Sequence, residues 1–197
     1  MEDWRRETPG KVVDGAIQGL EGHPRERDVF LRGMVRLLRD LPIDEVARRD
    51  EIRQAYRRAL QQEERMLQTI RQQARFLPDD PGGEVVVMDF TSFNKPPRMV
   101  KKLAFLLFPD AQAVVEVRNP MRGNVKSRDL SISMSLGICL SNKEHRRNVG
   151  EIMRELNIGD GHAGAGAGLV NCASRAEMLG EKERLLRDIM KIWKTQV

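Results

Sequence analysis

A run of small residues from Gly159 to Val170 is the stretch of this sequence best suited to chemistry. It holds five glycines and three alanines around one histidine, His162. Few side chains shield the backbone N–H groups near Gly159, Gly161 and Gly164, so an anion such as phosphate can approach them closely. The same composition also suits a strand that packs tightly against a helix. The pattern therefore leaves two interpretations open, a phosphate-binding loop and a packing element.

Two polar side chains interrupt this run. His162 has no bulky neighbour to fix it in a core, so its ring can hydrogen-bond a phosphate or stack on a base. The alternative is an exposed histidine in a turn. Asp160 argues against an anion site, because a carboxylate repels a phosphate unless its side chain points away.

A second polar pattern lies at 129–137, where apolar and polar residues alternate strictly. This period of two predicts a strand with Ser131, Ser133 and Ser135 on one face and aliphatic side chains on the other. Three hydroxyl groups pointing one way can bind a phosphate or a ribose. They equally suit the solvated side of an edge strand.

Four basic residues surround the turn expected at 119–124, namely Arg118, Arg122, Lys126 and Arg128. They can supply positive charge to a bound phosphate, although such clusters also occur in simple solvated loops. No catalytic residue is predicted in this chain. No metal site is predicted either, because neither the histidines nor Cys139 and Cys172 have the spacing of metal ligands.

The elements that must position these residues alternate between strand and helix after residue 84. Strands are predicted at 84–90, 112–118, 129–137 and 165–172, and helices at 96–108, from a capping box at Ser141, and from one at Ser174. This order predicts an α/β fold, with a mixed β-sheet flanked by helices.

The residues before that point are expected to be entirely helical. Thr8-Pro9 and Pro24 mark two helix starts, and Asp50 caps a long helix over 51–77. The Pro- and Gly-rich segment 78–83 then predicts a boundary between a helical segment, 1–77, and an α/β domain, 84–197. The apolar seam of the long helix makes a homo-oligomer possible.

The composition is that of a globular protein. The 197 residues are 40% hydrophobic and 32% charged, with a net charge of +5. This mild basic excess is compatible with nucleic-acid or nucleotide partners but does not require them. We expect no membrane span, because no long apolar run is present, and a cytoplasmic location, because cysteines are few.

The order of a serine strand, a helix, a Gly-His run and a final helix resembles the type 1 DHH-associated domain. This is the C-terminal domain of RecJ-like phosphoesterases, and the resemblance covers roughly 84–197. Its hallmark is a Gly-Gly-Gly-His element, matched here by Gly159-Asp160-Gly161-His162 with Asp160 in place of the middle glycine. The family usually carries an arginine after the Ser-aliphatic pair of the strand, whereas Ser135 follows Ser133-Met134 here.

The resemblance implies that the chain is the substrate-binding C-terminal part of a DHH-family phosphoesterase and is not catalytic on its own. Its substrate would be a nucleotide, a short oligonucleotide or another phosphate ester such as polyphosphate. In the family a separate upstream domain with an Asp-His-His motif binds divalent metal, usually manganese, and no such motif occurs here. We therefore expect no cofactor in this chain and manganese in a preceding catalytic domain.

An alternative function belongs to a different class. The same domain type is appended to alanyl-tRNA synthetases, where it serves RNA binding and association. The long helix over 51–77 favours such a non-catalytic nucleic-acid-binding or oligomerisation module, whereas the Gly-His run with the serine strand favours the phosphoesterase.

Overall fold

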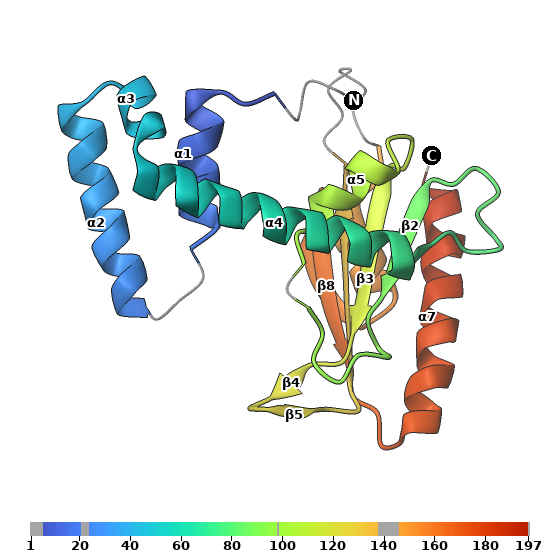
Figure 1. Cartoon of the computed structure of the whole chain (residues 1–197). Coiled ribbons are helices and arrows are strands. Elements are labelled where there is room, and N and C mark those ends of the chain that lie inside the picture. Colours follow the sequence, from blue (N-terminus) through green and yellow to red (C-terminus); the bar gives the residue numbers. More distant parts are fainter. Residues whose placement is uncertain (1–5, 21–23, 98, 138–145, 197) are drawn as a thin grey trace. The chain divides into compact units, whose positions relative to one another are not determined.

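The computed structural model describes residues 6–20, 24–97, 99–137 and 146–196. The chain divides into two compact units, Met1–Gln68 and Thr69–Val197 (Figure 1). The division falls inside the long helix and precedes the predicted boundary at 78–83.

The first unit is helical, as the sequence predicted. It contains α1 (Pro9–Gln18), α2 (Pro24–Asp40), α3 (Ile43–Arg48) and the greater part of α4 (Asp50–Gln73). The hydroxyl of Thr8 caps α1 by accepting from the Lys11 N–H at 3.3 Å. The core of this unit is formed by Val12, Val13, Ala16, Met34, Val46, Ala47, Ile52, Ala55 and Tyr56.

The end of α4 differs from the prediction. The helix stops at Gln73, four residues before the expected end, and Ala74–Arg75 form a short strand, β1, antiparallel to β2 (Val85–Asp89). Segment 1–77 is therefore not helical throughout. Leu77 continues the apolar spacing that predicted a longer helix. It is buried in the core of the second unit, after the helix has ended.

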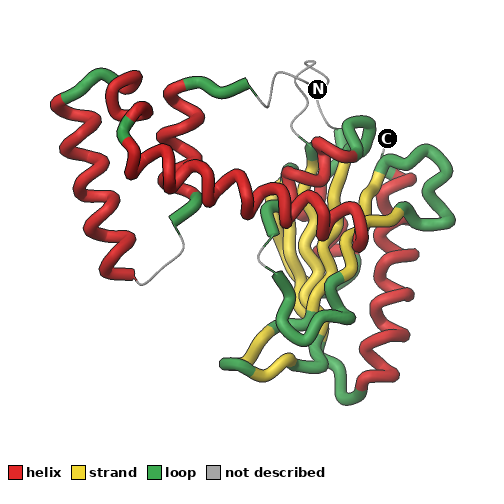
Figure 2. Tube along the Cα trace, in the orientation of Figure 1, coloured by secondary structure: helices red, strands yellow, loops and turns green. Residues whose placement is uncertain are grey.

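The second unit is a mixed six-stranded sheet with helices, which confirms the predicted α/β class. Figure 2 shows its strands in yellow and its helices in red. The strand order is β1-β2-β3-β6-β8-β7, and among these described strands only β2 and β3 are parallel. The strands that follow β2 in this order are β3 (Ala113–Arg118), β6 (Leu130–Leu136), β8 (Ala165–Val170) and β7 (Gly159–His162). The core is largely made by the aliphatic face of these strands with α6 (Val149–Glu155) and α7 (Arg175–Thr195).

Three local predictions need correction or lie outside the described residues. The helix expected at 96–108 is reduced to a 3₁₀ turn, Lys101–Leu103, and one helical turn, α5 (Ala104–Leu107). The turn expected at 119–124 is a small hairpin of β4 (Met121–Arg122) and β5 (Val125–Lys126), with Gly123 at φ +63°. The capping box at Ser141 falls in 138–145, outside the described residues, and Asn148 caps α6 instead.

A buried ion pair joins α7 to the end of β2. The Lys182 ammonium lies 2.7 Å from the Asp89 carboxylate, and their side chains are 10% and 18% exposed. The same ammonium also donates to the Thr91 hydroxyl at 3.4 Å. Burial alone would raise the pKa of Asp89, but hydrogen bonds from Lys182 and Thr91 outweigh it and hold that pKa below its ordinary value.

Asp89→Asn should destabilise the protein by about 3 kcal/mol, because it leaves the Lys182 charge buried without its partner. Urea denaturation at pH 7 measures this loss. Because the folded pKa of Asp89 is lowered, its stabilising effect is present above the ordinary aspartate pKa and disappears as pH falls through the folded value. The variant should lack this part of the acid dependence.

Asp188→Asn is the matched control, since it removes more exposed pairs with Arg184 and Lys191 on the same helix. It should cost less than about 1 kcal/mol. Equal losses in the two variants would contradict the importance of the buried pair.

Candidate functional site

The Gly-rich run forms a β-hairpin, whose second strand lies within the strand predicted at 165–172. Gly159–His162 is β7, and it pairs antiparallel with β8 from Gly159↔Gly168 to His162↔Ala165. Ala163 and Gly164 form the turn between the two strands. The hairpin therefore lies at one edge of the sheet, with β7 as the outer strand.

Close packing explains most of the glycines. An ideal Cβ on Gly159 would lie 2.0 Å from the Ala167 carbonyl oxygen, and one on Gly161 would lie 2.3 Å from that of Ala165. On β8, a Cβ at Gly166 would come within 2.9 Å of Met153 from α6. The packing interpretation of the run thus accounts for its small residues without a ligand.

The packing does not explain Asp160, whose carboxylate accepts two hydrogen bonds. One comes from the Gly161 backbone N–H at 2.7 Å and the other from the Arg154 guanidinium at 2.5 Å. The Gly161 N–H and the guanidinium of Arg154 hold the pKa of Asp160 below its usual value. An internal carboxylate therefore occupies donors of the kind that a phosphate would require.

His162 is exposed at the end of β7. Its Nδ1 accepts a hydrogen bond from the Gly164 N–H at 3.1 Å, which closes the turn. Nε2 remains the ring nitrogen available to a ligand.

The strand register brings the predicted polar residues onto one face of the sheet. Ser133 and Asp160 both pair with Ala167, and Ser135 and His162 both pair with Ala165. Residues that pair directly across strands share a face, so each serine is separated from its partner on β7 by one alanine. With strands about 4.8 Å apart, Ser135 and His162 are about 10 Å apart along such a row.

β3 extends this face with two charged residues. Glu116 pairs with Ser133, and Arg118 pairs with Ser131. Arg118 lies 3.4 Å from the buried Glu116 carboxylate. We call this surface the serine face, and it consists of Glu116, Arg118, Ser131, Ser133, Ser135, Asp160 and His162.

Lys101 approaches the serine face from the 3₁₀ turn before α5. Its ammonium donates to the Ser133 hydroxyl at 3.1 Å. Burial lowers the pKa of Lys101, Glu116 acts to raise it, and Arg118 lowers it further. The sequence did not identify Lys101, since a lysine in an expected helix carries no signal. Glu116 was detectable, because it shares a period of two with Arg118 in an otherwise apolar strand.

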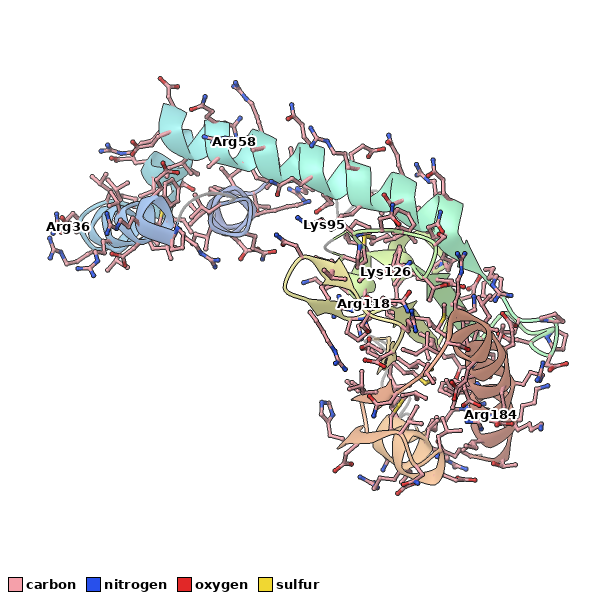
Figure 3. All side chains as sticks on the ribbon, turned by 90° about the horizontal axis from the view of Figure 1, so that it is seen from below. Arg36, Arg58, Lys95, Arg118, Lys126 and Arg184 are labelled. Atoms are coloured by element: carbon pink, nitrogen blue, oxygen red, sulfur yellow. The ribbon has the colours of Figure 1, made fainter. Side chains whose placement is uncertain are left out.

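The four predicted basic contacts have different partners in the structure. Arg118 belongs to the serine face, whereas Arg122 pairs with Asp129 at 2.8 Å. Lys126 donates to the Thr91 carbonyl at 2.5 Å, and Arg128 donates to the Ala173 carbonyl at 3.0 Å. Arg118 ends β3 and Lys126 ends β5 (Figure 3).

Within the described residues, no group of three or more His, Cys, Asp or Glu side chains could hold a metal ion. No helix in the same part of the chain is long and apolar enough to cross a membrane.

No protein-family model matches the sequence, and no curated protein matches it. Solved structures share its fold. A pGpG-specific phosphodiesterase, PggH from Vibrio cholerae, is 13% identical with a TM-score of 0.69, covering 98% of this chain and 64% of PggH. The DHH domain of a member of a ribosomal protein family is 13% identical with a TM-score of 0.50, covering 81% of this chain and 36% of that one.

An exopolyphosphatase-related protein from Bacteroides fragilis is 14% identical with a TM-score of 0.42, over 83% of this chain and 44% of that one. The chain thus spans less than two thirds of each of these structures. At the level of the fold, the likeness to PggH and to the DHH domain supports the predicted resemblance to the DHH family, and the assignment to its type 1 associated domain stays a prediction.

Gly161→Ala should destabilise the protein by about 1–3 kcal/mol, because the added methyl collides with the β8 backbone. Gly180→Ala is the control, since nothing lies within 4 Å of its Cβ position on the exposed side of α7. That change should stabilise the helix by up to about 1 kcal/mol. Thermal unfolding of both variants compares them, and an unchanged midpoint for Gly161→Ala would refute the packing explanation.

Proposed function

We propose that this chain holds the phosphate of a nucleotide, short oligonucleotide or other phosphate ester on the serine face. It would act as the substrate-binding part of a DHH-type phosphoesterase, with catalysis supplied by an upstream DHH domain. The observation that carries the proposal is the register of β6, β8 and β7. It aligns Ser133 with Asp160 across Ala167, and Ser135 with His162 across Ala165.

The chemistry of the serine face supports an anionic ligand. Its donors are the serine hydroxyls, the Lys101 ammonium, the Arg118 guanidinium and Nε2 of His162. The intervening alanines have short side chains, so a phosphate can approach the strands between them. This sequence lacks the arginine that the family carries after the Ser-aliphatic pair, and Lys101 and Arg118 bring positive charge to the same face, part of which Glu116 offsets.

Asp160 acts as an internal competitor in this proposal. Its carboxylate holds the Gly161 N–H and the Arg154 guanidinium, and both are groups that bind phosphate well. A ligand that uses these donors must displace the carboxylate. The side chain that departs from the family pattern would therefore weaken substrate binding rather than prevent it.

The divalent metal that the family resemblance implies, usually manganese, does not fit the described residues, which offer no set of three ligands. In this proposal, the catalytic metal is bound by the upstream DHH domain. The fold likeness to PggH makes pGpG a suitable test ligand.

Asp160→Asn should tighten pGpG binding, because it removes the charge that competes for Arg154 and the Gly161 N–H. His162→Ala should weaken binding about tenfold, through the loss of one hydrogen bond to a charged group. Isothermal titration calorimetry with pGpG measures both effects.

Glu155→Gln is the matched control for Asp160→Asn, since it removes one negative charge from an exposed position on α6. A similar gain in both variants would indicate a general effect of net charge. If the parent chain binds no pGpG at millimolar concentration, the phosphate-binding proposal fails and the nucleic-acid-binding or oligomerisation alternative gains support.

A further inference from the structure

A polar cleft of about 800 Å³ lies in the second unit, beyond the carboxyl ends of β2 and β3. Asp89 ends β2, and Asn119 directly follows β3. Ligands of α/β proteins commonly bind outside the carboxyl ends of parallel strands. We propose that this cleft is a separate binding site for a nucleotide, with its phosphate held by Lys126, Arg128 and Arg175.

The charges that line the cleft are mainly positive. Of the described residues in its walls, Asp89 alone is acidic and five are cationic, namely Arg75, Lys126, Arg128, Arg175 and Lys182. Asp89 is already paired with Lys182, and Arg75 lies 3.6 Å from Glu183. Within the part of the chain that the structure describes, Lys126, Arg128 and Arg175 have no carboxylate partner, so their charge is available to an anion.

Backbone contacts hold two of these cations in place. Lys126 donates to the Thr91 carbonyl and Arg128 to the Ala173 carbonyl, so each cation is anchored by a neutral acceptor. A carbonyl oxygen fixes a cation without cancelling its charge. An anion that enters the cleft therefore meets positioned cations and loses less side-chain entropy on binding.

A buried acceptor in the wall of the cleft suits a ligand that carries a hydrogen-bond donor as well as a negative charge. Asn119 lines the cleft and is 1% exposed, and its Nδ2 donates to the Asp129 carbonyl at 2.9 Å. Its Oδ1 is buried with no hydrogen-bond partner among the described residues. A buried acceptor without a partner is costly, and an N–H or O–H donor beside it would offset that cost.

The remaining walls suit the other parts of a nucleotide. Thr91, Ser92, Asn94 and Ser127 supply polar groups of the kind that bind ribose, and Met178 with the partly exposed Leu179 forms an apolar wall for a base. The N-terminus of α7 is not the source of attraction. The Ser174 hydroxyl accepts from the Glu177 N–H at 3.1 Å, and the Glu177 carboxylate accepts from the Ala173 N–H, just before the helix, at 2.7 Å, so this end of the helix already carries an acidic side chain.

The cleft shares no residue with the serine face as defined above. Lys126 and Arg128, which the sequence grouped with Arg118 as contacts to one phosphate, belong to the cleft instead. The inference therefore does not depend on the proposed function of the serine face.

The test is a titration of the full chain with AMP, followed by amide NMR shifts and by calorimetry at low salt. In the double variant Arg128→Ala/Arg175→Ala, AMP should no longer shift the amide signals of the cleft residues. Calorimetry should show that AMP binds to it at least about tenfold more weakly than to the parent chain. Arg187→Ala/Lys191→Ala, which removes two exposed cations from α7 outside the cleft, should leave those shifts unchanged. Ribose 5-phosphate should bind more weakly than AMP, and adenosine more weakly still.

His162→Ala separates the two sites, because it should remove shifts on the serine face and preserve those of Asn119, Lys126 and Arg175. Absence of cleft shifts at millimolar AMP would overturn the inference, even if the serine face binds. Cleft binding that survives in the double variant would overturn it too. Circular dichroism confirms that each variant is folded.

Discussion

The register between β6 and its two neighbours is the constraint on which the second unit depends. Because strand side chains alternate between faces, a shift of one residue would expose Ile132 and Met134 and bury the serines. Burial of the aliphatic side chains therefore also fixes which polar side chains share the opposite face of the sheet. Every geometric relation within the serine face, from Arg118 to His162, follows from this pairing with β3, β8 and, through β8, β7.

Much of this architecture could be predicted from the sequence, because its signals are local. Strict alternation predicted β6, and the side chains of Thr8 and Ser174 cap helices where expected. The predicted end of α4 was wrong because Leu77 continues the apolar spacing of the helix, although it is buried in the core beside the sheet. Of the hairpin, β8 lies within the strand predicted at 165–172, whereas β7 was missed because Gly159–His162 lacks the contrast in hydrophobicity that reveals a period.

The candidate site was predictable only in part, since its long-range partners leave no trace in sequence spacing. Ser133, Ser135, Asp160 and His162 do share a face, yet Lys101 reaches that face from a segment 32 positions away from Ser133. The basic residues near the β4–β5 hairpin show the converse. Proximity in sequence grouped Arg118 with Lys126 and Arg128, and the fold separates them between the serine face and the cleft.

The pair formed by Asp160 and Arg154 has a consequence for the behaviour of the protein in concentrated solution. The outer strand of a sheet exposes unpaired N–H and C=O groups that can recruit a strand from another molecule. On β7, the Asp160 carboxylate accepts from the Gly161 N–H and Arg154 lies 3.5 Å from the Gly161 carbonyl oxygen, so both groups are engaged. A glycine-rich edge is an open template for aggregation, and here one ion pair shields its centre.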